Sequence, residues 1–136
     1  DIDYGWSGNL QFGVAIRYPS FADQSQSNGI ETDNGPNDND VQPYTTGVLS
    51  NITLLGPIVS GTSNSVQNNA YAGDFRRRTA LSVFNSVMAG FRFGIRFNQA
   101  SVLGQYQNGV GVLANNILIA PASTYNAGSG VAVADV

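Results

Sequence analysis

Hydrophobic residues fall into short clusters of strand length, separated by stretches rich in Gly, Asn, Ser and Asp. Helical periodicity is weak along the whole chain, and β-branched residues are common inside the clusters, which is typical of strands. The strands predicted from this pattern are Leu10–Tyr18, Gly29–Thr32, Val48–Leu55, Ala80–Ala89, Gly94–Phe97 and Val112–Ala120. The two long loop regions are predicted at Gln24–Pro43 and Ser60–Gly73. The protein is therefore expected to be mainly β.

Three of these clusters repeat one pattern, in which an Asn interrupts an apolar run: Asn51, Asn85 and Asn115. A second phrase, beginning Gly29-Ile30, recurs as Gly94-Ile95, and each copy precedes an Asn phrase by 22 or 21 residues. A period of roughly 20–50 residues marks folds whose units bury their apolar faces by stacking. Stacking brings equivalent positions together, so these three Asn side chains are predicted to form an amide ladder at one corner.

Two β architectures are compatible with this pattern. An antiparallel sandwich would use hairpin turns, for which Asn28-Gly29, Asn34-Gly35 and Asn108-Gly109 are suitable. A parallel β-solenoid requires like residues at like positions in successive coils, and the repeated phrases favour it. The wider spacing from Asn51 to Asn85 is then attributed to an insertion around Ser60–Gly73. The predicted fold is all-β, a parallel solenoid with long inserted loops.

Several segments also resemble parts of a known family: residues 5–13, 27–34, 49–57 and 76–91. They are similar to large right-handed parallel β-helix proteins, pectin-lyase-like in fold, that Gram-negative bacteria secrete, often through type IX secretion. The resemblance covers roughly Asp1 to Pro121. It implies a pectin-lyase-like superhelix and an extracellular or outer-cell-surface location, and it brings no known catalytic set. We expect residues 1–136 to be one module, a fragment of a longer chain, because the sequence begins without Met.

Composition narrows the choice of partners. Charged residues make up only 11%, the formal net charge is −3, and all six basic side chains are Arg, which argues against nucleic acid as a partner. The sequence contains no apolar run of about 18 residues, so no membrane-spanning helix is predicted. The partners expected are other chains of a surface or envelope assembly, flanking parts of the same precursor, or a polysaccharide.

The chain contains neither His nor Cys. A Ser-His-Asp triad, a Cys-His dyad, an imidazole metal site and a disulfide are therefore excluded within it. Its acidic residues cluster instead, with Glu31, Asp33, Asp38 and Asp40 around a Gly turn. Such hard oxygen ligands suit Ca²⁺, although the spacing is not that of an EF-hand. The set is thus a candidate calcium site, and a solvated acidic loop is the alternative.

Glu31 and Asp33 would point to the same face of a strand, as a glycosidase pair must. Polysaccharide lyases of the β-helix type use Ca²⁺ and a basic side chain, and that resemblance makes Arg78, Arg92 and Arg96 candidate ligand-binding residues. Alternatively, the arginines lie on an outer sheet face and pair with Asp74 or neighbouring acids.

The function predicted from these observations is a non-catalytic extracellular β-helix module with a structural, adhesive or envelope-assembly role. The alternative is a carbohydrate-active enzyme or glycan-binding module, polysaccharide lyase-like, that uses calcium. An enzyme would need acids and Arg on one face, whereas a spacer would scatter them around the rod.

Overall fold

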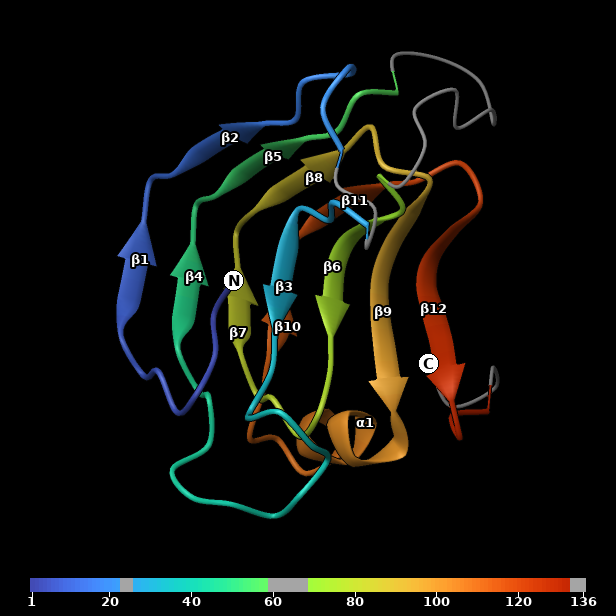
Figure 1. Ribbon diagram of the computed structural model, residues 1–136. Coiled ribbons are helices and arrows are strands. Elements are labelled where there is room, and N and C mark those ends of the chain that lie inside the picture. The colour runs from blue at the N-terminus through green and yellow to red at the C-terminus, as the bar shows by residue number, and fades with distance from the viewer. Residues whose placement is uncertain (23–25, 59–68, 133–136) are drawn as a thin grey trace.

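In the computed structural model the chain winds into a right-handed parallel β-helix (Figure 1). The structure describes residues 1–22, 26–58 and 69–132. Its elements are β1 (Asn9–Gln11), β2 (Val14–Ile16), β3 (Ile30–Thr32), β4 (Val48–Ser50), β5 (Thr53–Leu55), β6 (Tyr71–Phe75), β7 (Ser82–Phe84), β8 (Val87–Ala89), β9 (Phe93–Gln99), α1 (Ala100–Gln107), β10 (Leu113–Ala114), β11 (Ile117–Ile119) and β12 (Ser123–Ser129).

The strands form three sheets, each with one strand from every coil. Their orders are β1-β4-β7-β10, β2-β5-β8-β11 and β3-β6-β9-β12. Every pair of neighbouring strands is parallel. An isolated parallel bridge from Ile2 to Thr32 extends the third sheet beyond β3. The predicted parallel solenoid is confirmed, and the antiparallel sandwich is wrong.

Four of the predicted strands each prove to be two strands with a sharp corner between them. The corner residues are Phe12, Asn51, Asn85 and Asn115, and each has a positive φ between 50° and 61°. This left-handed conformation turns the chain from the first sheet into the second, and Asn tolerates it better than most residues. The Asn in each repeated phrase therefore marks a corner of the coil.

Phe12 occupies this corner in the first coil, where the later coils have Asn. A bulky side chain in the left-handed region costs roughly 1–2 kcal/mol. We expect Phe12→Asn to raise the free energy of unfolding by about 1 kcal/mol, whereas Asn85→Ala should lower it by a similar amount. Urea denaturation of both variants measures the difference. Equal stabilities for wild type, Phe12→Asn and Asn85→Ala would contradict this account of the corner.

The recurring Gly29-Ile30 and Gly94-Ile95 phrases lie at equivalent positions of the third sheet, two coils apart. A Cβ on Gly29 would lie 2.5 Å from the carbonyl oxygen of Ala72, and one on Gly94 would lie 2.0 Å from that of Thr124. Each glycine therefore lets the backbone of the next coil approach closely, which explains why this part of the phrase repeats.

The core runs along the inside of the coil as stacked columns of apolar side chains. One column contains Leu10, Leu49, Val83 and Leu113, and another contains Ala15, Leu54, Met88 and Leu118. Phe75 and Phe97 lie in register in the third sheet, with ring centroids 6.4 Å apart. Burying these columns between the coils supplies most of the stabilising hydrophobic free energy.

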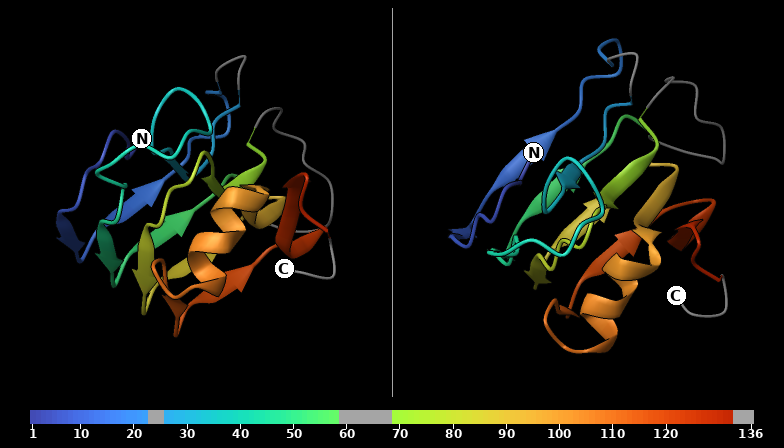
Figure 2. Two further views of the ribbon diagram at one scale, coloured as in Figure 1. Left: turned by 90° about the horizontal axis from the view of Figure 1, so that it is seen from below. Right: turned by 60° about the horizontal axis from the view of Figure 1, so that its bottom comes forward.

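Three elements were not predicted from the sequence pattern. β6 lies largely in the expected loop Ser60–Gly73, whose residues 60–68 are outside the described part of the chain. β12 follows the last predicted strand, and α1 forms where helical periodicity is weak. The helix packs across one corner of the coils (Figure 2) and buries Val102 and Leu103 against the core. It therefore replaces a simple turn between β9 and β10.

Tyr106 fastens α1 to the neighbouring coil. Its hydroxyl donates a hydrogen bond to the carbonyl oxygen of Leu81 at 2.6 Å, and its ring stacks on Phe75 with centroids 5.9 Å apart. Burial raises the pKa of this phenol well above its ordinary value of 10. The side chain is therefore held in its neutral, donating form.

The pKa of Tyr106 predicts a loss of stability in alkali. As the pH rises above about 10, the unfolded chain releases the phenol proton before the folded chain does, so stability falls by up to about 1.4 kcal/mol per pH unit. Tyr106→Phe should cost about 1 kcal/mol at neutral pH and should show a shallower alkaline slope. Urea denaturation from pH 8 to pH 11 measures both. Identical slopes for the two proteins would contradict the prediction.

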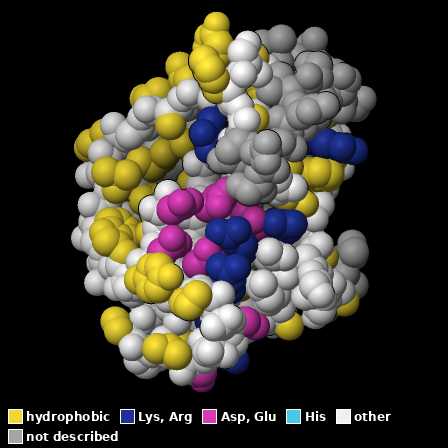
Figure 3. Space-filling model, viewed as in Figure 1, with side chains coloured by type: hydrophobic (Ala, Val, Ile, Leu, Met, Phe, Trp, Pro, Cys, Tyr) yellow, Lys and Arg dark blue, Asp and Glu magenta, His cyan; other side chains and the backbone are white. Residues whose placement is uncertain are grey.

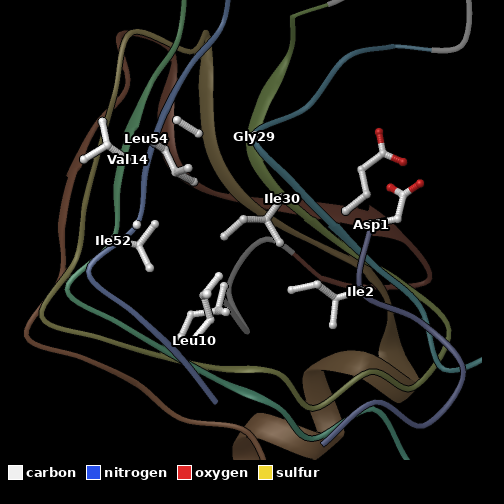
Figure 4. Close-up of a pocket in the computed structure, with 12 residues that line it drawn as sticks. Asp1, Ile2, Leu10, Val14, Gly29, Ile30, Ile52 and Leu54 are labelled. Carbon is white, nitrogen blue, oxygen red and sulfur yellow. The ribbon is translucent and has the colours of Figure 1, made fainter. Parts of the chain in front are cut away.

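At both ends of the described part of the β-helix, apolar side chains from its interior are exposed. At the first coil, an apolar hollow of about 240 Å³ opens between Leu10, Ile30, Ile52 and Leu54 (Figure 4). At the last coil, a second hollow of about 480 Å³ is lined by Phe97, Leu103, Tyr106 and Tyr125, among others. Each end therefore presents the same kind of surface that the coils bury between them.

Candidate functional site

Charged side chains gather on the outer face of the third sheet (Figure 3). We call this the charged face, and it comprises Glu31, Asp33, Asp74, Arg76, Arg77 and Arg96. The register places Glu31 beside Asp74 and Asp74 beside Arg96, so these three residues form a row across β3, β6 and β9. Acidic and basic groups from three coils therefore meet on one surface.

Arg96 in β9 and Asp74 in β6 form a bidentate ion pair. Nε of Arg96 lies 2.8 Å from Oδ1 of Asp74, and Nη2 lies 2.6 Å from Oδ2. The Asp74 side chain is only 1% exposed, whereas that of Arg96 is 20% exposed. Paired hydrogen bonds between charged groups are the strongest kind in proteins, and this pair connects two coils.

Arg76 makes a similar pair in the opposite direction, from β6 toward β3. Its Nε lies 3.1 Å from Oδ1 of Asp33, and its Nη2 lies 2.7 Å from Oδ2. The same Nη2 lies 3.2 Å from Oε2 of Glu31, and Nη1 lies 4.0 Å from Oδ2 of Asp74. Arg77 adds a contact of 3.3 Å to Asp33. Arg76 thus bridges three carboxylates from two coils.

The pKa values of the charged face are shifted by burial and by pairing. Burial raises the pKa of Asp33 above its ordinary value of 3.8, and Arg76 and Arg77 offset part of that rise. Burial alone would lower the pKa of Arg76 and of Arg96, but their carboxylate partners more than compensate, so both pKa values are raised. Both guanidinium groups therefore stay charged at any pH at which the protein folds.

Two aromatic rings lie at one end of the charged face. Tyr71 and Phe93 stack with centroids 5.2 Å apart, and they are in register between β6 and β9. The guanidinium carbon of Arg96 lies 4.2 Å from the centre of the Tyr71 ring, and that of Arg92 lies 5.0 Å from the centre of the Phe93 ring. These contacts are cation–π interactions, which hold the arginines flat against the sheet.

The predicted ligand-binding arginines do not all come together. Arg96 lies on the charged face and pairs with Asp74, as the alternative interpretation of the sequence expected. Arg92 lies beside it on Phe93. Arg78 lies at the corner after β6, within 3.9 Å of Asp38 and 3.8 Å of Asp40. Two of the three residues are thus near one another, and the third belongs to a different surface.

The four candidate calcium ligands divide into two pairs. Glu31 and Asp33 contact Arg76 on the charged face. Asp38 accepts a hydrogen bond from the Ser101 hydroxyl at 2.5 Å, and Asp40 accepts one from the hydroxyl of Tyr44. No group of three or more acidic, His or Cys side chains that could hold a metal ion occurs among the described residues. The structure therefore does not bring the four carboxylates around one point.

The predicted Asn ladder lies on the side of the coil where the first and second sheets meet. Asn51, Asn85 and Asn115 occupy equivalent corners, and the backbone N–H of each of the first two donates to a carbonyl oxygen of the next coil, at 3.1 Å. The side-chain amide of Asn51 donates to the Ser50 hydroxyl at 2.8 Å. The side-chain hydrogen bonds between successive corners are made instead by the residues that follow the Asn. The Ile52 N–H donates to the Ser86 hydroxyl oxygen at 3.0 Å, the Ser86 N–H donates to Oδ1 of Asn116 at 3.0 Å, and Nδ2 of Asn116 donates to the carbonyl oxygen of Val83 at 2.8 Å.

Sequence reasoning missed two parts of this site. Tyr71, Asp74 and Arg76 share one surface only because β6 exists, and the sequence pattern placed most of β6 in a loop. The contact from Arg76 to Glu31 and Asp33 depends on the register of β6 against β3, across more than 40 residues of chain. The one available signal was the alternation of Asp74 and Arg76, which places them on the same side of an extended strand.

Comparison with known proteins identifies the fold family. No curated protein and no solved structure matches the chain. No helix within the described residues is long and apolar enough to cross a membrane. A family model described as a pectate-lyase like beta helix domain matches residues 1–131, nearly the whole chain. The three parallel sheets, the repeated left-handed corner and this match together show that the chain belongs to the pectate-lyase like beta helix family.

Proposed function

We propose that the chain is a non-catalytic structural module, part of a stiff β-helical rod in a surface or envelope assembly. The observation that carries this proposal is the pairing on the charged face. Asp33 and Asp74 each accept two hydrogen bonds from an arginine of the adjacent coil. Charges used in this way brace one coil against the next, and a carboxylate so engaged is a poor general base or nucleophile.

The ends of the module support a role in a longer assembly. Leu10 is exposed at the first coil, although Leu49 and Val83 in the same column are buried. The outer edges of β1 and β2 pair with no other strand among the described residues. Such an edge is a template for another parallel strand. We infer that its partner is a further β-helical coil, from flanking sequence or from another chain of the assembly.

The location that we propose is extracellular, on the outer cell surface of a Gram-negative bacterium, with an adhesive or envelope-assembly role. The resemblance of residues 5–13, 27–34, 49–57 and 76–91 to secreted β-helix proteins supports it, and type IX secretion is the export route that this resemblance suggests. A surface of amides and hydroxyls with few charges suits such an exposed rod. Fractionation of cells that express the full precursor, followed by surface proteolysis, would test the location.

The structural role predicts loss of stability without loss of any ligand. Arg76→Gln should lower the free energy of unfolding by about 2–3 kcal/mol, because Asp33 is left partly buried without its partner. The matched control is Arg92→Gln, which removes an arginine with a cation–π contact and should cost at most about 1 kcal/mol. The wild-type chain should bind nothing on a glycan array. Reproducible, saturable binding of a glycan would overturn the purely structural role in favour of the glycan-binding candidate below.

A second candidate function, glycan binding or carbohydrate-directed catalysis, is favoured by one observation. The acids, the arginines and the Tyr71–Phe93 stack occupy one sheet face and are not scattered around the rod. This candidate predicts that an acidic oligosaccharide binds the charged face and that Tyr71→Ala weakens that binding. Because the structure pairs Glu31 and Asp33 with Arg76, and Asp38 and Asp40 with Arg78, this candidate expects calcium to raise the melting temperature only when the oligosaccharide is also present. Thermal melts with calcium and with a chelator, together with titration of oligouronates, test this candidate.

A further inference from the structure

The outer side of the second sheet is apolar along all four coils, with Thr53 as the one polar position. Residues that alternate with the buried column point outward in β2, β5, β8 and β11. They form two columns, one of Val14, Thr53, Val87 and Ile117 and the other of Ile16, Leu55, Ala89 and Ile119. We call this surface the aliphatic face. It contains no charged residue.

The aliphatic face is well exposed, especially at its two ends. The exposed fractions are 72% for Val14, 71% for Ile16, 56% for Ile117 and 59% for Ile119. Residues that point outward from a solvent-exposed sheet are usually polar, as they are on the charged face of the third sheet. Contiguous apolar patches of several hundred Å² mark interaction sites on soluble proteins. The aliphatic face is therefore better explained by a partner than by solvent.

We propose that a second copy of this chain packs on the aliphatic face, sheet against sheet, with the two rods side by side. The face is uncharged, so two copies bury no unpaired ionisable group when they meet. Neighbouring strands are about 4.8 Å apart, so the three intervals between the four strands make the face roughly 14 Å long, and two sheets that pack face to face lie about 10 Å apart. Two copies would together bury on the order of 1,000 Å², the lower limit for a specific interface.

A two-fold axis along the rod gives this pairing a definite register. It keeps the order of the coils and brings one column of the first copy against the other column of the second. Thr53 then faces Leu55 of the second copy, and Val87 faces Ala89, so that a larger side chain meets a smaller or equal one. A two-fold axis along the strands would reverse the coil order and bring Thr53 against Val87. These two arrangements can be distinguished by cross-linking.

The first test measures association of the 136-residue chain by sedimentation velocity over a range of concentrations. We expect a concentration-dependent dimer, and we expect Leu55→Glu to weaken it at least about tenfold, because the substitution places a charge in the centre of the interface. The matched control is Val41→Glu, an exposed apolar residue in the loop after β3. A monomer at all concentrations, or a dimer equally sensitive to both substitutions, would overturn the proposal.

The second test does not depend on the stability of Leu55→Glu. The chain has no Cys, so introduced thiols are the only ones present. Mixing Thr53→Cys with Leu55→Cys and a short bis-maleimide should give a cross-linked mixed dimer, whereas mixing Val41→Cys with Leu55→Cys should not. A bifunctional reagent is needed because sheets about 10 Å apart hold facing Cα atoms too far apart for a direct disulfide. If Thr53→Cys cross-links instead to Val87→Cys, the aliphatic face is an interface but the proposed axis is wrong. Absence of both cross-links would overturn the interface itself.

This interface is independent of stacking at the rod ends and of the structural role proposed above. Phe12→Glu places a charge at the end of the first coil, and it should leave the side-by-side dimer intact while opposing end-to-end growth. Loss of the dimer on Phe12→Glu alone, with Leu55→Glu still dimeric, would assign the association to the rod end and refute the aliphatic face.

Discussion

Replacing Phe75 with Ala is expected to lower the free energy of unfolding by about 3–5 kcal/mol. The ring is completely buried, it contacts Phe97 and Tyr106, and it joins the third sheet to α1. Its removal leaves a cavity between two coils that the stiff backbone ladders cannot close. Urea denaturation followed by circular dichroism measures the loss.

Two further variants make the Phe75 result interpretable. Phe75→Leu keeps most of the buried volume and should cost clearly less than Phe75→Ala. Val41→Ala, at an exposed loop position, should change stability by no more than about 0.5 kcal/mol. If Phe75→Ala cost no more than Val41→Ala, then the stacked aromatic column could not be a main source of stability.

Replacing Asp74 with Asn is expected to cost about 3 kcal/mol, the second-largest effect. The Asp74 side chain is almost fully buried, and it accepts both prongs of the Arg96 guanidinium. Removing one member of a buried pair leaves the other charge without compensation, which is typically worth about 3–5 kcal/mol. Because Arg96 keeps some contact with water, we expect the lower end of that range. The free energy of unfolding in urea is the quantity to measure.

The exposed pair of Arg78 and Asp40 provides the comparison for Asp74. These groups are 3.8 Å apart and the Asp40 side chain is largely exposed, so Asp40→Asn should cost less than about 1 kcal/mol. A double-mutant cycle of Asp74→Asn with Arg96→Gln should give a coupling free energy well above that of Asp40→Asn with Arg78→Gln. Equal coupling energies would show that burial of Asp74 does not strengthen its pair.

The repeated Asn phrases predicted the fold because a solenoid imposes the same backbone on every coil. Asn51, Asn85 and Asn115 share a left-handed φ. Because few residue types adopt this conformation easily, it restricts the choice of residue wherever the chain turns from the first sheet into the second. Phe12 has the same φ, yet a Phe carries no such signal, so the first corner was read as the middle of one strand. The local backbone conformation could thus be predicted from the sequence only where that conformation is unfavourable for most residue types and the favoured type is present.

Elements that depend on contacts between distant residues were less predictable. β6 contains Gly73 and Asp74, which rarely indicate a strand, and it forms because β3 and β9 pair with it on both sides. α1 contains Gly104 and β-branched Val102, and it is stabilised by packing on the coils more than by its own propensity.

The charged face was predictable only in part, for the same reason. Glu31 and Asp33 share a side of β3 by simple alternation, and Asp74 was foreseen as a partner for arginine. The contact of Arg76 with Glu31 in β3 and with Asp33 just after it needs the register between β3 and β6, which no local pattern contains. Asp38 and Asp40 were grouped with Glu31 and Asp33 because the four acids are close in sequence. The chain leaves the third sheet before Asp38, however, and Asp38 and Asp40 pair with Arg78 instead.

The constant corner of the coil decides where this protein can accept new sequence. Two residues separate β1 from β2, and the same is true of each later pair of strands at that corner. The connections at the other two corners range from three residues, as between β8 and β9, to 15 residues, as between β3 and β4, and the register of the sheets is kept throughout. Insertions can therefore accumulate along the two borders of the third sheet without unravelling the ladder. The same β-helix can in this way present loops of different length on either side of the third sheet, while the sheet itself stays unchanged.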